Sequence, residues 1–115
     1  MKKIPFLAAL IALSATLSSC DKCDSENPRA RILNNGTGEA SVQIKTSGGN
    51  TENLNNVPAG ASSDYRGYGA GMVTFTVTVD KAELVESVQM SECYEYDITV
   101  DANNNITTTA RDRND

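Results

Sequence analysis

Residues 71–79 read Gly-Met-Val-Thr-Phe-Thr-Val-Thr-Val, and from Val73 onward every second residue is large and apolar. Because successive side chains of a β-strand point to opposite faces, this alternation places Phe75 and the valines on one face and the threonines on the other. β-Branched and aromatic residues also favour the extended backbone. The stretch therefore predicts a strand with one buried face, on which Phe75 is fully buried.

Weaker versions of the same pattern lie on both sides of this strand. Extended segments are expected at residues 29–34, 40–45, 54–57, 62–68, 84–90, 94–100 and 106–110. Clusters of Asn, Gly and Asp separate them, and these residues tolerate the backbone angles of tight turns. With about seven or eight short strands and no helical stretch after residue 19, residues 29–115 predict an all-β fold, a single small antiparallel β-sandwich.

Two positions depart from this simple pattern. Glu86 has the same parity as the apolar Leu84 and Val88, so a β-bulge or a position on an edge strand is expected there. Residues 111–115 are mostly charged and are expected to form a frayed tail.

Three short runs carry a family resemblance. Residues 56–60 (Asn-Val-Pro-Ala-Gly), 63–65 (Ser-Asp-Tyr) and 71–77 resemble a pattern found in small immunoglobulin-like or transthyretin-like sandwiches. Such domains recur in bacterial surface lipoproteins and adhesin stalks. The resemblance covers a small part of the chain and implies the fold, and it transfers no functional residue.

The amino-terminal 19 residues have the composition of a cleaved signal peptide. Two lysines at residues 2–3 precede an apolar run at residues 4–17, which is shorter than the roughly 20 residues that a membrane-spanning helix needs. The run ends in Leu-Ser-Ser-Cys, which resembles the lipobox of bacterial lipoproteins. The resemblance implies cleavage after Ser19 and lipidation of Cys20, which attaches the chain to a membrane. The alternative is an ordinary signal peptide followed by an unrelated cysteine.

Residues 20–28 are polar and are predicted to form a lipidated tether ahead of the domain. Asp21, Asp24 and Glu26 make its start acidic. In lipoproteins of Bacteroidota such a stretch resembles a signal for export to the cell surface, whereas in enterobacterial lipoproteins Asp21 resembles a signal for inner-membrane retention. A solvated linker explains the same residues without any signal. We expect a lipid-anchored position in a bacterial cell envelope, at the outer membrane, with exposure at the cell surface as a further hypothesis.

Composition excludes several classes of function. Without residues 1–19 the chain has 8 basic and 15 acidic side chains and hence a net charge of −7, which disfavours binding to nucleic acid. Histidine, the commonest general base and metal ligand, is absent. Tryptophan, a frequent platform for sugars, is also absent, although four tyrosines remain. No cofactor is expected.

The three cysteines divide into one and two. If Cys20 carries the lipid, Cys23 and Cys93 remain as an even pair in an oxidising compartment, and we predict a disulfide between them. A free thiol in the tether, or an intermolecular bridge through Cys23, are the competing interpretations.

Residues 67–72 (Gly-Tyr-Gly-Ala-Gly-Met) begin like a dinucleotide-binding fingerprint. Met72 stands where the final glycine is required, however, and no helix is expected to follow. An ordinary loop between two strands is therefore predicted. If this region has a function, Tyr65 and Tyr68 are its candidate aromatic contact tip.

Asp101, Asn103 and Asn105 have the spacing of calcium ligands in an EF-hand loop. Ile106 occupies the position at which that loop needs glycine, and an ordinary hairpin turn explains the same residues. No metal site is assigned on this basis, and calcium binding by the turn is left open.

Glu95 and Asp97 are the remaining candidate for chemistry. Two residues apart on one strand, their side chains share a face at about 7 Å, which is compatible with the acid pair of an inverting glycosidase. A solvated sheet face explains them more simply. Without histidine, a Ser-His-Asp arrangement cannot form.

We therefore expect a module without catalytic residues, held to a membrane by lipid on Cys20, that presents a β-sandwich surface to an envelope protein, a host protein or a glycan. One alternative is an accessory structural subunit of a larger envelope lipoprotein complex. The other is a small hydrolase that uses Glu95 and Asp97.

Overall fold

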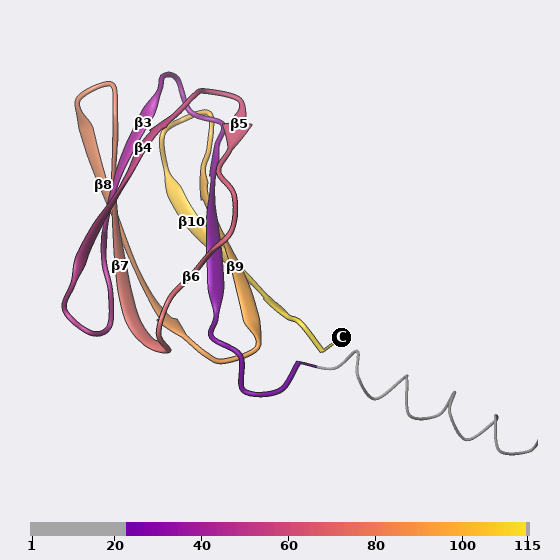
Figure 1. Ribbon diagram of the computed structural model, residues 1–115. Helices are drawn as coiled ribbons and strands as arrows, with labels where there is room; N and C mark the ends of the chain where they lie inside the picture. Colours follow the sequence, from indigo (N-terminus) through magenta and orange to yellow (C-terminus); the bar gives the residue numbers. More distant parts are fainter. Residues whose placement is uncertain (1–22, 115) are drawn as a thin grey trace, which may run out of the picture.

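The computed structural model describes residues 23–114, so the signal peptide expected at residues 1–19 and the lipidation site Cys20 lie outside the described residues. Nine strands make up the secondary structure of this part of the chain (Figure 1). They are β2 (Arg29–Asn34), β3 (Ala40–Lys45), β4 (Thr51–Val57), β5 (Ala61–Ser62), β6 (Arg66–Gly67), β7 (Gly71–Val79), β8 (Ala82–Met90), β9 (Tyr94–Val100) and β10 (Ile106–Asp112). The all-β prediction is confirmed.

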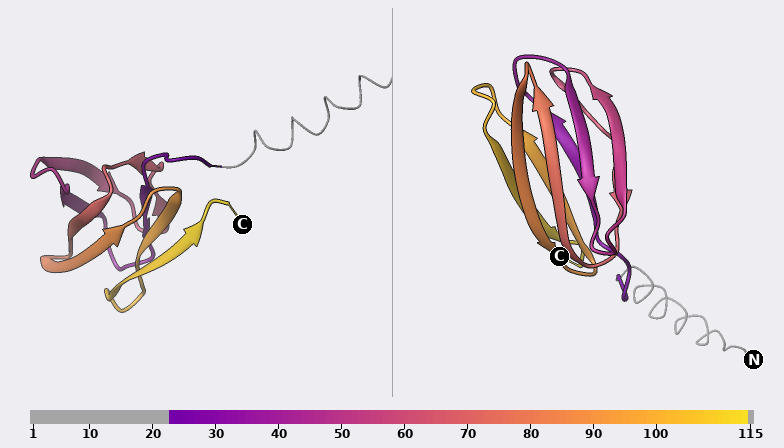
Figure 2. Two further views of the ribbon diagram at one scale, coloured as in Figure 1. Left: turned by 90° about the horizontal axis from the view of Figure 1, so that it is seen from below. Right: turned by 90° about the vertical axis from the view of Figure 1, so that its left-hand side faces the viewer.

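The strands form two sheets that pack face to face as a sandwich (Figure 2). The first sheet has the order β10-β9-β2-β5, with β6 also paired to β2, and the second has the order β4-β3-β7-β8. Neighbouring strands of the second sheet are all antiparallel. Short turns join β3 to β4 and β7 to β8, whereas β4, β5 and β6 lie between β3 and β7 in the chain. The long strands run between two ends, which we call the proximal end, where residues 23–28 lie, and the distal end.

One pairing in the first sheet is parallel, which the antiparallel prediction did not include. Strand β2 pairs in parallel with β9, so that Arg29 lies opposite Glu95 and Arg31 opposite Asp97. Parallel neighbours need a long connection between them, and here most of the domain separates the two strands in sequence. Local alternation fixes which face each residue occupies, but it does not fix this pairing.

The core fills the space between the inward faces of both sheets. Phe75 is 1% exposed in the middle of β7, as its position in the alternation predicted. The other fully or nearly fully buried apolar side chains include Ile32, Ile44, Val73, Val77, Val79, Met90, Ile98 and Val100. Burial of this apolar surface is the main favourable term that holds the two sheets together.

Polar contacts join the two sheets at both open sides of the sandwich. On one side Thr108 of β10 donates a hydrogen bond of 2.6 Å to Glu86 of the edge strand β8. On the other side Arg66 of β6 lies 3.4 Å from Glu52 of β4. The register of β7 and β8 is continuous through Glu86, so of the two expectations for this residue the edge position is the one the structure has.

The distal turns are organised by Asn34, which is 0% exposed. Its amide donates to the carbonyl oxygens of Gly38 and Val57 at 2.9 and 2.8 Å, and its side-chain oxygen accepts from the backbone N–H of Gly36 at 3.0 Å. A Cβ atom on Gly36 would lie 2.6 Å from Oδ1 of Asn104 and 3.1 Å from Oδ1 of Asn34, so a larger residue here would displace these side chains. The sequence pattern predicted Asn34 only as the last residue of an extended segment and did not indicate its buried role.

Candidate functional site

The proximal end contains the disulfide. Cys23 and Cys93 are joined with an S–S distance of 2.09 Å and a Cα–Cα distance of 5.7 Å, and this is the pair that the sequence predicted. Cys93 lies in the turn between β8 and β9 with a positive φ of 63° and is 9% exposed. The bond fastens the first described residue to the body of the domain.

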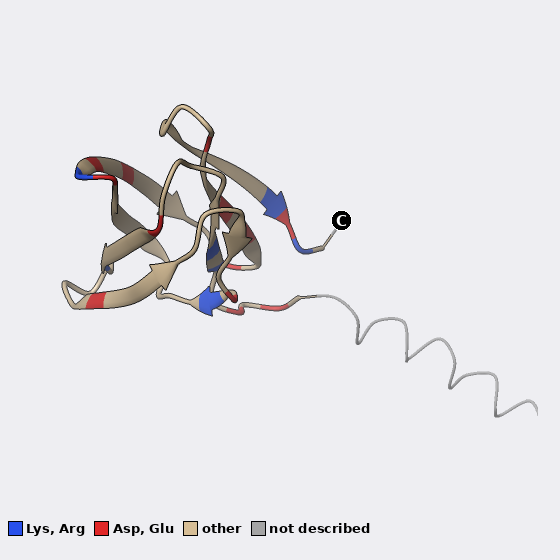
Figure 3. Cartoon of the chain, turned by 90° about the horizontal axis from the view of Figure 1, so that it is seen from above, with Lys and Arg blue, Asp and Glu red and all other residues tan. Residues whose placement is uncertain are grey.

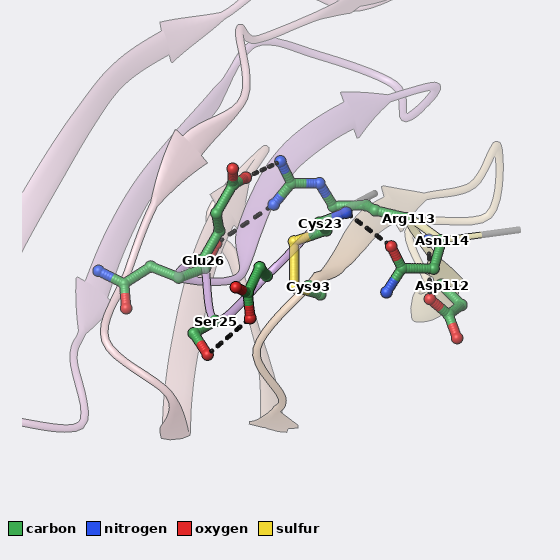
Figure 4. Close-up of a disulfide and its surroundings, with 9 residues drawn as sticks. Cys23, Ser25, Glu26, Cys93, Asp112, Arg113 and Asn114 are labelled. Atoms are coloured by element: carbon green, nitrogen blue, oxygen red, sulfur yellow. Dashed lines mark hydrogen bonds and ion pairs between the residues drawn. A yellow bond between two sulfur atoms is a disulfide. The ribbon is translucent and has the colours of Figure 1, made fainter. Parts of the chain in front are cut away.

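Residues 23–28 and 112–114 are held together around this disulfide (Figure 4). The backbone N–H of Cys93 donates to the carbonyl of Glu26 at 2.9 Å, and the guanidinium of Arg113 lies 2.7 Å from the Glu26 carboxylate. The N–H of Cys23 donates to the side chain of Asn114 at 2.7 Å. Residues 23–28 of the predicted tether are therefore held to the domain, and the tail up to Asn114 is not frayed as expected, because the two segments bind each other and the turn at Cys93.

The outer face of the first sheet carries a network of ion pairs, which we call the arginine network: Arg29, Arg31, Tyr65, Glu95, Asp97 and Arg111. Arg29 donates from Nε and Nη2 to Oε1 of Glu95 at 2.9 and 2.7 Å, and Arg111 donates to the other oxygen, Oε2, at 2.7 Å. Charged residues form separate bands along the chain, and long stretches of strand between them carry no charge (Figure 3).

Asp97, two residues further along β9, is bound in the same way. Its Oδ1 accepts a hydrogen bond of 2.9 Å from Nε of Arg31, and the hydroxyl of Tyr65 donates to the same oxygen at 3.0 Å. Each guanidinium carbon of Arg29 and Arg31 lies 4.8 Å from the centre of the Tyr65 ring. The face predicted as merely solvated is therefore a connected polar layer in which Glu95 is 9% exposed.

Both carboxylates have a lowered pKa. Burial alone would raise the pKa of Glu95, but hydrogen bonds from Arg29 and Arg111 outweigh it and bring the pKa below its ordinary value of 4.5. Burial alone would likewise raise the pKa of Asp97, but the hydrogen bonds from Arg31 and Tyr65 bring it below its ordinary value of 3.8. A glycosidase needs one carboxylic acid with a raised pKa as proton donor, so this geometry disfavours the hydrolase hypothesis.

Tyr65 and Tyr68, expected as one aromatic tip, lie in different environments. Tyr68 is 5% exposed and packs edge-to-face on Phe75, with ring centroids 6.1 Å apart, so it belongs to the core and not to a contact tip. Its parity along β6 and the following loop brings it inward, a signal that the three glycines around it obscured. Tyr65 is half-buried, and its hydroxyl is held by Asp97 and Arg111.

Beside Tyr65 lies a hollow of about 510 Å³ on the open side of the sandwich between β4 and the β5–β6 segment. We call this space the hollow. Residues 54–58 and 62–66 line it: Leu54, Asn55, Asn56, Val57, Pro58, Ser62, Ser63, Asp64, Tyr65 and Arg66. Tyr65 is thus shared by the arginine network and the hollow. The sequence indicated Tyr65 as a site residue but not Asn55 and Asn56 of β4 or Asp64 of the loop between β5 and β6.

The turn at residues 101–105 has a structural explanation. Oδ1 of Asp101 accepts from the backbone N–H groups of Asn103 and Asn105, both at 2.9 Å, which is a side-chain-stabilised turn. The hydrogen bond from the backbone of Asn105 is the main reason that the pKa of Asp101 is lowered. Within residues 23–114, no group of three or more acidic or cysteine side chains is arranged to hold a metal ion.

Comparison with known proteins supports the fold but assigns no family. No family model matches the chain, and no curated protein matches it. A solved structure described as the NMR structure of the protein from Eubacterium rectale is similar, with a TM-score of 0.54 at 13% sequence identity, over 73% of this chain and 87% of that one. Likeness at this identity concerns the all-β fold alone. Among the described residues, no helix has the length and apolar character needed to cross a membrane.

Proposed function

We propose that this chain is a lipid-anchored binding module of a bacterial cell envelope, without catalytic activity, that presents a β-sandwich surface to a protein or glycan partner. The observation that carries the proposal is the disulfide between Cys23 and Cys93, three residues after the Cys20 of the lipobox-like sequence. Only Asp21 and Lys22 separate Cys20 from the clamped Cys23. A lipid on Cys20 would hold the domain within about 10 Å of the membrane.

This attachment gives the domain an orientation. The lipid joins the sandwich at its proximal end, so the distal turns point away from the membrane and the hollow opens at the side of the sandwich. Strand β7 has nine residues, which corresponds to about 30 Å between the two ends. The contacts around Glu26 and Arg113 hold the chain after Cys23 against the proximal end.

The finer assignments are part of the proposal. The acidic Asp21, Asp24 and Glu26 support an outer-membrane position with exposure at the cell surface. The two packed sheets support the likeness to immunoglobulin-like or transthyretin-like sandwiches that the runs at residues 56–60 and 71–77 suggest. A disulfide is also what an oxidising compartment outside the cytoplasm favours.

The alternative of a permanently covered accessory subunit has less support. Such a subunit needs a contiguous apolar patch of several hundred Å². The exposed large apolar side chains among residues 23–114 are Met72, at 50%, and Val85, at 56%. The pair formed by Thr74 and Ser87 lies between them on the outer face of the second sheet, so they do not form one patch.

Cell fractionation tests the anchor. The unaltered chain should be found with membranes and be released by detergent, whereas Cys20→Ala should accumulate as unprocessed precursor or leave the membrane fraction. Cys23→Ala is the matched control, since it removes a neighbouring cysteine and the disulfide but keeps the lipidation residue. Membrane association of Cys20→Ala at the mass of the processed chain would contradict the proposal.

A further inference from the structure

We propose that the hollow between β4 and the β5–β6 segment binds one or two sugar rings of a neutral glycan. The inference rests on the proposed binding role and names the class of partner and its site. It is carried by the chemistry of the side chains that line the hollow, by the contacts that bound it toward either end of the sandwich and by its charge.

The hollow offers polar groups that the fold itself leaves available. Among residues 23–114, no group forms a hydrogen bond or ion pair with the carboxylate of Asp64 or with the side-chain amides of Asn55 and Asn56. Carboxylate and amide groups together supply acceptors and donors for adjacent sugar hydroxyls. The Tyr65 ring lies beside them and is held in place through its hydroxyl by Asp97 and Arg111. A held aromatic ring among polar groups is a typical composition for a small-ligand site.

The backbone at the hollow is irregular where these amides lie. The pairing of β3 with β4 shifts register between Ala40 and Val42, so that Asn55 and Asn56 together oppose Ser41 in a β-bulge. Asn56 has a positive φ of 43°. Non-glycine residues in this region of backbone space are uncommon and concentrate at turns and functional sites.

The shape of the hollow favours a compact ligand over an extended peptide. A peptide that adds to the free edge of β4 needs a continuous row of backbone groups, and the bulge at Asn56 interrupts that row. The ion pair between Arg66 and Glu52 links the two sides of the hollow toward the proximal end. The turn after Val57, in which Ala61 donates to the carbonyl of Pro58 at 3.1 Å, closes it toward the distal end.

Charge favours a neutral glycan over an acidic one. The charged groups that line the hollow are Asp64 and Arg66, and Arg66 is already paired with Glu52. The chain without residues 1–19 has a net charge of −7, from 8 basic and 15 acidic side chains, and would repel a polyanion. A neutral sugar needs no unpaired cation in the hollow and is not repelled by the negative chain. Its uncharged hydroxyls bind the carboxylate and the amides.

A glycan array followed by titration tests the inference. The processed chain is purified from whichever cell fraction holds it, with dodecylphosphocholine as a sugar-free detergent if that fraction is membrane. It should bind at least one neutral glycan on an array of neutral and acidic glycans. The soluble oligosaccharide of the best binder is then titrated into Asp64→Asn, Asn55→Ala and the control Glu92→Gln, an exposed acid in the turn between β8 and β9.

Asp64→Asn and Asn55→Ala should each weaken binding by about tenfold or more, the effect of losing a hydrogen bond of this kind, while Glu92→Gln should bind as the unaltered chain does. Equal melting temperatures for all variants will show that they fold alike. The inference is overturned if no neutral glycan binds, if acidic glycans alone bind, or if Asp64→Asn binds with the same affinity as the unaltered chain. None of these results bears on lipidation at Cys20, which is tested separately.

Discussion

Cys23 and Cys93 are bonded to each other at the proximal end, and Cys93 also donates its backbone N–H to the carbonyl of Glu26 at 2.9 Å. The disulfide joins residues 70 positions apart, so β2 to β8 lie within one closed loop, and β9 and β10 follow it. The same contacts that stabilise the domain therefore also fix where its amino-terminal segment leaves it.

Removing the disulfide should strongly destabilise the domain. The variant with Cys23→Ser and Cys93→Ser should lose about 4 kcal/mol of unfolding free energy, because the unfolded chain is no longer constrained by a loop of this length. Urea unfolding measures the change, and the unaltered chain in the presence of a thiol reductant should show the same loss. Equal midpoints for the oxidised chain and the variant would show that the bond does not stabilise the fold.

Phe75 tests the assignment of the inward face. Phe75→Ala should cost about 3–5 kcal/mol of unfolding free energy, since it removes a side chain that is 1% exposed and leaves a cavity between the sheets. Thr76→Ala, the adjacent residue on the outer face, should cost well under 1 kcal/mol. Similar losses for the two variants, measured by thermal or urea unfolding, would contradict this arrangement of β7.

Asn34 tests the organisation of the distal turns. Asn34→Ala removes three hydrogen bonds and leaves the buried carbonyl of Val57 without its donor, so it should cost about 2–4 kcal/mol. The neighbouring Asn35 is exposed and gives the matched control, Asn35→Ala, with an expected cost below 1 kcal/mol. Hydrogen exchange at Gly36 should accelerate in the first variant only.

Glu95 predicts a specific pH dependence of stability. Its pKa is lower in the folded chain than its ordinary value of 4.5, so its contribution to stability is complete above that value and is lost as the pH falls through the lowered pKa. Glu95→Gln should therefore lower the unfolding free energy by about 1–3 kcal/mol at neutral pH and by progressively less below pH 4.5.

Unfolding across this pH range, by circular dichroism, measures the effect. Glu39→Gln, at an exposed acid just before β3, is the control and should follow the unaltered chain at every pH. A constant difference between Glu95→Gln and the unaltered chain down to the lowest pH would mean that the ion pairs with Arg29 and Arg111 do not set the pKa.

Strand positions were predictable because they depend on local alternation. The alternation at residues 73–79 correctly gave β7 and the burial of Phe75. The parity of Glu86 predicted either a bulge or an edge position, and the edge position is the one observed. Tyr68 was misplaced because glycines on both sides remove the alternation that would have marked it as inward. Its contact with Phe75 depends on the whole fold.

Pairings between distant segments were less predictable. Arg29 and Arg31 have the same two-residue spacing as Glu95 and Asp97, and this match of opposite charges is the signal that could have indicated the β2–β9 pairing. The hollow combines the bulge at Asn56 with Asp64 of the β5–β6 segment. The local sequence pattern predicts neither the bulge nor the approach of this segment to β4. The pairing of Cys23 with Cys93 was accessible because counting cysteines needs no geometry.

The central claim, attachment through Cys20, is tested most directly by the mass of the amino-terminal peptide. The chain is isolated from its native envelope, reduced, digested with trypsin and analysed by mass spectrometry. The account predicts that the first peptide is Cys20-Asp21-Lys22, with a diacylglycerol thioether on Cys20. A first peptide that begins before Cys20, or that contains an unmodified Cys20, would contradict it.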